Sequence, residues 1–215
     1  MRNLFAKTLS KLAEKNTNIY IVVADISPAG SMEIFQKRNP DRFINVGVAE
    51  QSMISVCAGL AMSKKKPFAY TISTFSLYRP FEMIRNDICY QNLPVTIVGM
   101  GAGTIYSTLG ATHLTQEDIS VSRSIPNLQV LAPCDPMELK SCIEFCANKS
   151  DKPTYLRIGK TGELNFSSGS EKWKFGKIRN IFKGKNTCVL TYGPIIKMAF
   201  EVKKKINGNF SIYSC

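Results

Sequence analysis

Short apolar runs alternate with longer segments of helical character along most of this chain, and this alternation restricts the fold more than any other feature. The apolar runs lie at residues 19–24, 43–46, 67–72, 95–98, 128–131 and 154–158. Runs this short and this uniformly apolar are typical of strands buried on both faces of a parallel sheet. Helices are expected at residues 3–15, 31–37, 50–62, 77–90, 117–124 and 136–147. We therefore predict an α/β domain over residues 1–160, with a parallel sheet flanked by helices.

The chain changes character after Gly159. Residues 161–186 are polar, with several Gly and Ser, which predicts a linker containing a short hairpin around residues 173–182. A strand, a helix and a strand are then expected at 187–191, 194–205 and 210–213. Residues 187–215 read as the beginning of a second α/β domain that is incomplete. Such a unit cannot bury both faces of its sheet alone, so either the sequence is truncated or the unit packs on something else.

Composition and charge argue against several classes of protein. The formal net charge of +12 would attract polyanions, but no nucleic-acid-binding motif accompanies it, so we interpret the basic residues as a solvated surface. The seven Cys are irregularly spaced and only one His is present, which argues against a disulfide framework and against a metal site in this chain. No apolar run is long enough to span a membrane and no signal peptide is recognisable, so a cytoplasmic protein is expected.

The densest functional signal is the segment RFINVGVAEQ at residues 42–51. A short strand enters a turn with Gly47, and a carboxylate, Glu50, then opens a helix of small and apolar residues. Alone this means little, because the helix dipole stabilises a carboxylate at any helix N-terminus. Further along lie three aromatic residues at three-residue spacing and the one histidine of the chain: Phe75, Tyr78, Phe81 and His113. Aromatic residues at such spacing usually belong to a core, so their function depends on the wider context.

Four separated segments supply that context: GVAEQSMISVCAGLAMSKKKPFAYTISTF, RPFEMIRNDICYQNLPVTIVG, GATHLTQEDISVSRSIPNLQVLAPCDPMEL and PTYLRIGK. In motif and in order they resemble the pyrimidine-binding domain of the transketolase family. The resemblance covers about residues 1–160 and continues weakly over 187–215, which looks like the family's C-terminal domain. It implies a thiamine-diphosphate-dependent transferase that moves a two-carbon ketol unit between sugars.

The resemblance also implies which residues bind the cofactor. Glu50 would face the aminopyrimidine ring and share a proton with its ring nitrogen, which activates the cofactor. Phe75, Tyr78 and Phe81 would wall the pyrimidine pocket, a role that suits their flat rings. Asp25 follows a buried strand and would lie near the cofactor across a subunit interface.

Three more residues receive a role from the same resemblance. Ile26 would support the bent conformation of the cofactor. His113, in the motif GATH, would reach the reacting oxygens of the substrate. Arg157, in the motif YLR, would bind a phosphate group of the substrate.

Other positions depart from the family pattern. Leu109 stands where transketolases have an acidic residue that contacts sugar hydroxyls, and Ala29 and Gly101 stand where they have phosphate-binding residues. Of the phosphate-binding set, the sequence keeps Arg157 alone. The resemblance therefore implies a substrate that is less phosphorylated or otherwise modified, or one that a partner subunit holds.

The sequence contains no Gly-Asp-Gly followed by Asn, the motif that would hold Mg²⁺ and the diphosphate. The resemblance then implies a separate diphosphate-binding subunit, as in split transketolases, and a heterotetramer with two copies of each chain. Two alternatives stay open: the β subunit of a 2-oxo-acid dehydrogenase, and a truncated, non-catalytic module. A deoxyxylulose phosphate synthase is a further relative, although such enzymes are normally one chain.

Overall fold

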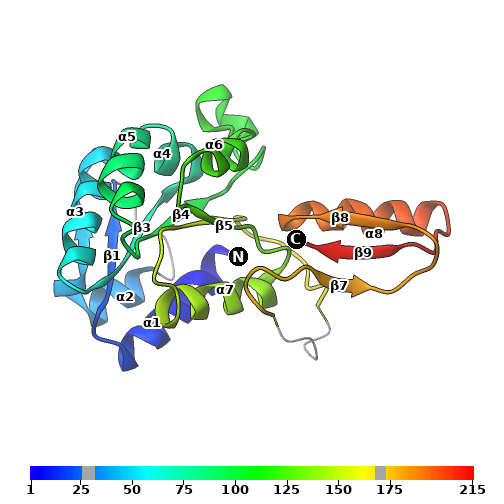
Figure 1. Cartoon of the computed structure of the whole chain (residues 1–215), viewed down its shortest axis with the longest axis horizontal. Coiled ribbons are helices and arrows are strands. Elements are labelled where there is room, and N and C mark those ends of the chain that lie inside the picture. Colours follow the sequence, from blue (N-terminus) through cyan, green and yellow to red (C-terminus); the bar gives the residue numbers. More distant parts are fainter. Residues whose placement is uncertain (26–31, 168–172) are drawn as a thin grey trace.

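The computed structural model describes residues 1–25, 32–167 and 173–215. Its larger part is a parallel sheet of six strands in the order β2-β1-β3-β4-β6-β5 (Figure 1). The strands are β1 (Ile19–Val23), β2 (Phe43–Asn45), β3 (Lys66–Ile72), β4 (Thr96–Met100), β5 (Gln129–Leu131) and β6 (Thr154–Ile158). Each strand falls on one of the apolar runs, and the predicted α/β fold with a parallel sheet flanked by helices is confirmed.

Helices cover both faces of this sheet (Figure 1). On one face lie α1 (Arg2–Lys15), α2 (Met32–Arg38) and α7 (Pro136–Asn148). On the other lie α3 (Glu50–Met62), α4 (Ser73–Leu77), α5 (Phe81–Met83), the π-helix η2 (Ile84–Tyr90) and α6 (Asp118–Ser124). Short 3-10 turns occur at η1 (Pro40–Arg42), η3 (Ser107–Leu109), η4 (Ala111–His113) and η5 (Gly193–Ile195). Within the described ranges, no helix is long and apolar enough to cross a membrane.

The core is divided by the sheet into two apolar clusters. Successive residues of a strand point to opposite faces, so Ile21 and Val23 join the cluster under α1 and α7, whereas Val22 joins the cluster under α3. Fully buried Phe5 stacks on Tyr70 of β3 in the first cluster. Burial of strands on both faces explains why their sequences are apolar throughout rather than alternating.

One predicted helix is wrong in its extent. The sequence pattern predicts a single helix over residues 77–90, but the chain forms α4, then a turn at residues 78–80, then α5 and η2. Pro80 has no N–H to donate and disfavours the helical conformation of the residue before it, Arg79. The turn therefore interrupts the helix in the middle of the aromatic series.

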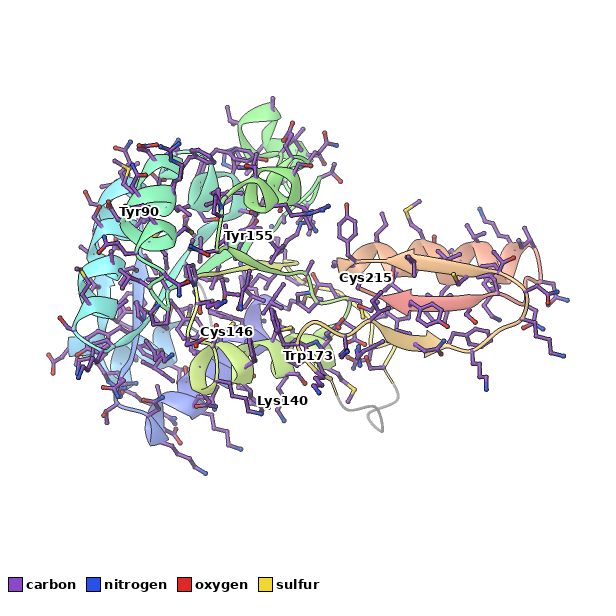
Figure 2. The ribbon with its side chains drawn as sticks, in the orientation of Figure 1. Tyr90, Lys140, Cys146, Tyr155, Trp173 and Cys215 are labelled. Atoms are coloured by element: carbon purple, nitrogen blue, oxygen red, sulfur yellow. The ribbon has the colours of Figure 1, made fainter. Side chains whose placement is uncertain are left out.

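The smaller part of the molecule is a second sheet in the order β7-β9-β8, packed against α8 (Ile196–Lys205). Strand β8 (Cys188–Thr191) runs parallel to β9 (Ser211–Ser214), as expected for a strand–helix–strand unit. The predicted hairpin around residues 173–182 is wrong, because β7 (Arg179–Phe182) pairs antiparallel with β9 instead. Figure 2 shows that Cys215, at the end of β9, lies where the two parts meet. The domain limits at residues 160 and 186 stay a prediction.

A buried polar network links the two parts. Asp135 caps α7 and accepts hydrogen bonds from the backbone N–H and the hydroxyl of Ser167. Glu138, on the first turn of α7, forms a buried ion pair with Arg179 of β7 and accepts a hydrogen bond from Ser214 of β9. Because each of these groups is paired, the network holds the smaller sheet in a defined place on the larger one.

Candidate functional site

The carboxyl edge of the parallel sheet collects most of the predicted site residues. Glu50 is the first residue of α3, where the helix dipole favours its negative charge, and its side chain is only 7% exposed. Arg79 lies in the turn between α4 and α5, and its Nη1 donates to Glu50 Oε1 at 2.8 Å. In the described part of the chain, Arg79 is the one side chain that bonds to this carboxylate.

Asn45 joins the turns that follow β1 and β2. Its Oδ1 accepts hydrogen bonds from the backbone N–H groups of Asp25, at 3.1 Å, and of Gly47, at 3.0 Å. Both residues have positive φ, 43° for Asp25 and 72° for Gly47, so each turn bends sharply at this point. Asp25 therefore lies at the same edge as the turn that leads to Glu50. Among the described residues, no contact joins the two carboxylates. Ile26 lies outside the residues that the structure describes.

His113 lies against Phe75, with ring centroids 5.1 Å apart in an edge-to-face arrangement. The loop that carries His113 is tied to α4 through buried Thr115, whose hydroxyl lies 2.7 Å from those of Ser73 and Thr74. This small hydroxyl cluster fixes the distance between the histidine and the aromatic ring. The structure thus brings together Glu50, Phe75 and His113 from three segments of the chain, because Arg79 contacts both Glu50 and Phe75, and Phe75 contacts His113.

Tyr78 and Phe81 do not continue a single stripe with Phe75. Both pack against the apolar cluster under α3, and the Tyr78 hydroxyl donates to Glu117 at 3.0 Å. Burial and the bond to Glu117 raise the pKa of the Tyr78 phenol, so it stays protonated as the donor. The aromatic series therefore has two environments, with Phe75 facing His113 and Tyr78 held by a surface carboxylate.

Arg157 lies in a buried network rather than free in a cleft. Its Nε donates to Asp118 Oδ2 at 2.7 Å, and the Tyr155 hydroxyl donates to the same oxygen at 2.9 Å. The side chain of Arg157 is 13% exposed and that of Asp118 only 1%. Figure 2 shows Tyr155 inside the larger part of the molecule. The exposed side of Arg157 lines a cleft of about 300 Å³ that also contains Lys197 of α8.

Two cations near the site were missed by sequence reasoning. Arg79 begins the family-like segment RPFEMIRND, but the resemblance gave it no role, and its place before Pro80 indicated only a turn. Lys160 follows β6, and its Nζ lies 4.5 Å from the ring centroid of Tyr106, which in turn lies 6.3 Å from the ring of His113. Lys160 could have been predicted as a site residue. It follows the carboxyl end of β6, which pairs with β4, and ligands of parallel sheets bind at the carboxyl ends of the strands.

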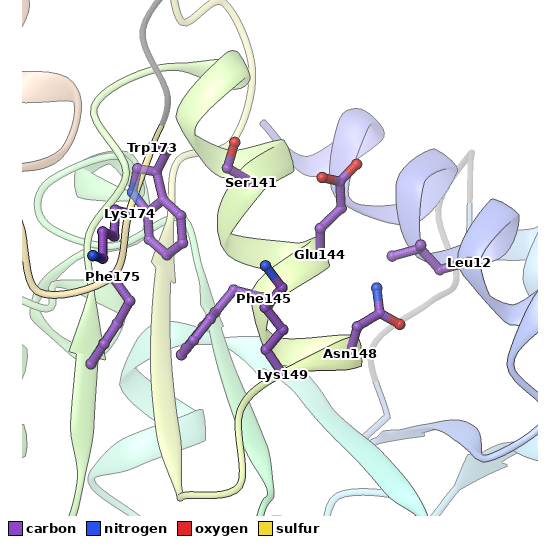
Figure 3. A pocket seen from close by; sticks show the side chains of 9 residues that line it. All are labelled: Leu12, Ser141, Glu144, Phe145, Asn148, Lys149, Trp173, Lys174 and Phe175. Atoms are coloured by element: carbon purple, nitrogen blue, oxygen red, sulfur yellow. The ribbon is translucent and has the colours of Figure 1, made fainter.

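A separate cavity of about 560 Å³ lies between α7, Leu12 of α1 and the segment that begins at Trp173 (Figure 3). Phe145 of α7 stacks on Phe175 with ring centroids 4.8 Å apart and meets Trp173 edge to face. This cavity contains none of the predicted site residues and lies beside the helix on the opposite face from α3. We therefore place the candidate site at the sheet edge.

The residues at this edge fit a flat, nitrogen-containing ring. Glu50 offers a carboxylate acceptor and Phe75 an aromatic face, and the guanidinium of Arg79, itself a flat N–H donor, already contacts both. These residues do not form a metal site, because no group of three or more His, Cys, Asp or Glu in the described ranges could hold an ion. These features define an α/β domain with a candidate site for a flat ligand at the carboxyl ends of its strands.

The family follows from comparison with known proteins. The transketolase pyrimidine-binding domain family matches residues 1–162, and the chain belongs to this family. The transketolase family uses thiamine diphosphate. The predicted family resemblance is thereby confirmed.

Several relatives match nearly the whole chain. A protein of Methanocaldococcus jannaschii described as a transketolase C-terminal section is 34% identical over 97% of this chain and 66% of its own length. A 6-deoxy-6-sulfo-D-fructose transketolase subunit of Clostridium sp. is 30% identical over 97% of this chain and 64% of its own length. A 1-deoxy-D-xylulose-5-phosphate synthase of Prochlorococcus marinus is 35% identical over 91% of this chain and 30% of its own length.

A solved structure agrees with the fold. A split-gene transketolase, in the form of an inactive β4 tetramer, superposes with a TM-score of 0.88 at 32% identity, over 99% of this chain and 70% of that chain. The present chain thus spans at most 66% of the length of the three relatives above.

Proposed function

We propose that this chain is the pyrimidine-activating subunit of a split transketolase-like enzyme that transfers a two-carbon ketol unit between sugars. One observation carries the proposal. Glu50, a nearly buried carboxylate at a helix N-terminus, is linked through Arg79 to the Phe75–His113 ring pair in a chain of the transketolase family. A carboxylate in that place suits proton exchange with a ring nitrogen.

Each residue of the site then has a task. Glu50 holds and returns the proton of the pyrimidine nitrogen, and Phe75 and Tyr78 orient the ring by contact with its faces. When bound, thiamine diphosphate supplies the nucleophilic carbon and stabilises negative charge on the transferred unit. His113, held against Phe75 by the Thr115 cluster, contacts the oxygens of the substrate. Asp25 and Phe81 support the cofactor from the rim of the pocket.

A partner subunit completes the site in this proposal. The described ranges hold no cluster of metal ligands, and the sequence lacks the diphosphate motif, so the partner would hold Mg²⁺ and the diphosphate. The split-gene relative, whose tetramer of one kind of subunit is described as inactive, supports this need for a second chain. A cytoplasmic assembly with two copies of each subunit is the form we expect.

The substrate is proposed to be a modified sugar. Leu109 is 54% exposed near the His113 turn and offers no hydrogen bond to a sugar hydroxyl. Arg157 shares its charge with Asp118, which leaves Lys160 as a second cation for an anionic group of the substrate. The Clostridium relative acts by its name on a sulfonated sugar, which fits a substrate other than the ordinary pentose phosphates.

Calorimetric titration of thiamine diphosphate with Mg²⁺ tests the proposal. The titration is made into this chain alone and into its mixture with a diphosphate-binding transketolase N-terminal subunit from the same genome. We expect binding only in the mixture, and loss of sugar turnover in Glu50→Gln. If no such partner restores binding, this chain is not a working half of an enzyme, and the non-catalytic module becomes the better interpretation.

A second candidate activity is synthesis of deoxyxylulose phosphate, favoured by the 35% identity to the Prochlorococcus synthase. The two activities differ in their product, because the synthase by its name makes 1-deoxy-D-xylulose 5-phosphate. Formation of 1-deoxy-D-xylulose 5-phosphate by the assembled enzyme would favour the synthase. Oxidation of a 2-oxo acid with an artificial electron acceptor would instead favour the dehydrogenase β subunit.

A further inference from the structure

Arg79 occupies an unusual place in the candidate site. It lies in the turn between α4 and α5, immediately before Pro80, which ends helical geometry there. The turn directs the side chain back over α4 and toward the start of α3. Arg79 is thereby the one described side chain that contacts both the carboxylate and the aromatic ring of the site.

Its two contacts have the chemistry of a ring ligand. The guanidinium carbon lies 4.1 Å from the ring centroid of Phe75, which is a stacking distance, and Nη1 donates to Glu50 Oε1 at 2.8 Å. An aminopyrimidine is likewise flat, likewise carries N–H groups, and would need the same carboxylate oxygen and the same aromatic neighbourhood. One carboxylate oxygen and one ring face cannot serve both groups in full.

The side chain can also leave this place. Arg79 is 49% exposed, whereas Glu50 is 7% exposed, so one partner of the pair is open to solvent and the other is not. Half-exposed ion pairs are weak because solvent screens them and because a long side chain loses freedom in forming them. An incoming ligand can therefore displace Arg79 without unfolding any element.

We propose that Arg79 takes the place of the cofactor's aminopyrimidine ring in the cofactor-free chain and must leave it before Glu50 can act. This inference rests on the proposed role of Glu50 in cofactor activation. Arg79 keeps the buried carboxylate paired before the cofactor binds, and the apparent affinity for the cofactor is reduced in proportion to the fraction of molecules in which Arg79 has left Glu50. The ligand class that displaces it is a flat heteroaromatic ring with an N–H donor.

The test compares cofactor affinity in four proteins, each assembled with the partner subunit. Arg79→Met removes the charge and the N–H groups but keeps the apolar stem over Phe75. Arg85→Met is the matched control, because Arg85 pairs with Glu82 on the exposed side of the same segment at 3.7 Å. Arg79→Lys keeps the charge without the flat donor group. Thiamine diphosphate with Mg²⁺ is titrated into wild type and the three variants by calorimetry, and circular dichroism checks that each is folded.

We expect Arg79→Met to bind the cofactor about 3- to 10-fold more tightly than wild type, since a weak ion pair no longer competes. Arg79→Lys should lie between them and Arg85→Met should equal wild type. If wild type binds and Arg79→Met binds equally or more weakly, the displacement role is wrong while the proposed function stands. If neither wild type nor Arg79→Met binds the cofactor, the proposed function and the displacement role fall together.

Discussion

Arg157 and Asp118 form a buried ion pair in which the Nε and Oδ2 atoms are 2.7 Å apart. The pair ties β6 to the first turn of α6, and Tyr155 donates to the same carboxylate oxygen. An arginine that resemblance assigns to a substrate phosphate is thus also a structural element. The two roles are separable by mutation.

Asp118→Ala should destabilise the protein by about 3–5 kcal/mol, because it leaves the guanidinium of Arg157 buried without its partner. Urea unfolding followed by circular dichroism measures this change. Glu82→Gln, which removes a partner from an exposed pair with Arg85, is the control and should change stability by no more than about 0.5 kcal/mol. A loss for Asp118→Ala as small as that of the control would mean that solvent, not Asp118, balances the charge of Arg157.

Glu50→Gln should lower the rate of ketol transfer by the assembled enzyme by about 10²- to 10⁴-fold, because an amide cannot exchange a proton with the ring. The substitution is nearly isosteric, so the melting temperature should change little. Single-turnover kinetics with saturating cofactor measures the rate without the contribution of product release. Retention of more than a tenth of the wild-type rate would remove Glu50 from the chemistry.

Thr115→Val should destabilise the loop that carries His113. The buried hydroxyl of Ser73 would lose its partner, and half-buried Thr74 would keep only its bond to the Leu114 carbonyl, at a cost of about 1–3 kcal/mol. Thr112→Val is the matched control, since the Thr112 hydroxyl is exposed and bonds only to the neighbouring His113 among the described residues. Equal loss of stability in the two variants would show that the hydroxyl cluster does not position the loop.

Acid should weaken the attachment of the smaller sheet through Asp135. Burial alone would raise the pKa of this carboxyl, but hydrogen bonds from Ser167, Glu138 and Phe166 outweigh it, so the net pKa lies below the ordinary value. A group whose pKa is lower in the folded state contributes stability above its unfolded pKa of about 4 and loses it as pH falls through the folded value.

The measurement is the free energy of unfolding at pH 7 and at pH 3. We expect a drop in wild type and a smaller drop in Ser167→Ala, because that variant lacks one of the bonds that favour the charged carboxylate. An equal drop in both proteins would assign the acid sensitivity to other groups.

Much of the fold was predictable because it depends on local composition. The uniform apolar runs at β1, β3 and β4 are required by burial on both faces of a parallel sheet, and no other arrangement of so many short runs satisfies that burial as well. The helix at 50–62 was predicted with the limits that the structure gives it. The helix predicted over 77–90 was wrong in its extent, and Pro80 within that segment already indicated a turn.

Long-range pairing was harder to predict than local structure. Strand β7 pairs with β9, although β8 and α8 lie between them in the sequence. Trp173 and Phe175 pack on Phe145 instead of belonging to the expected hairpin. Apolar and polar pattern alone does not say which strand edge will be free. The free edge depends on which strand edges the other segments of the chain already pair with.

The layered α/β architecture, the family, and the presence of a carboxylate, aromatic rings and one histidine at strand ends could all be predicted from the residues. Which of these side chains contact one another could be seen only in the folded chain. Phe75 faces His113 because the Thr115 hydroxyl ties the His113 loop to α4, Arg157 is balanced by Asp118, and Arg79 reaches Glu50 across 29 positions of the chain. Contacts of this kind depend on the distance between strand ends, which the parallel sheet sets and the order of residues does not reveal.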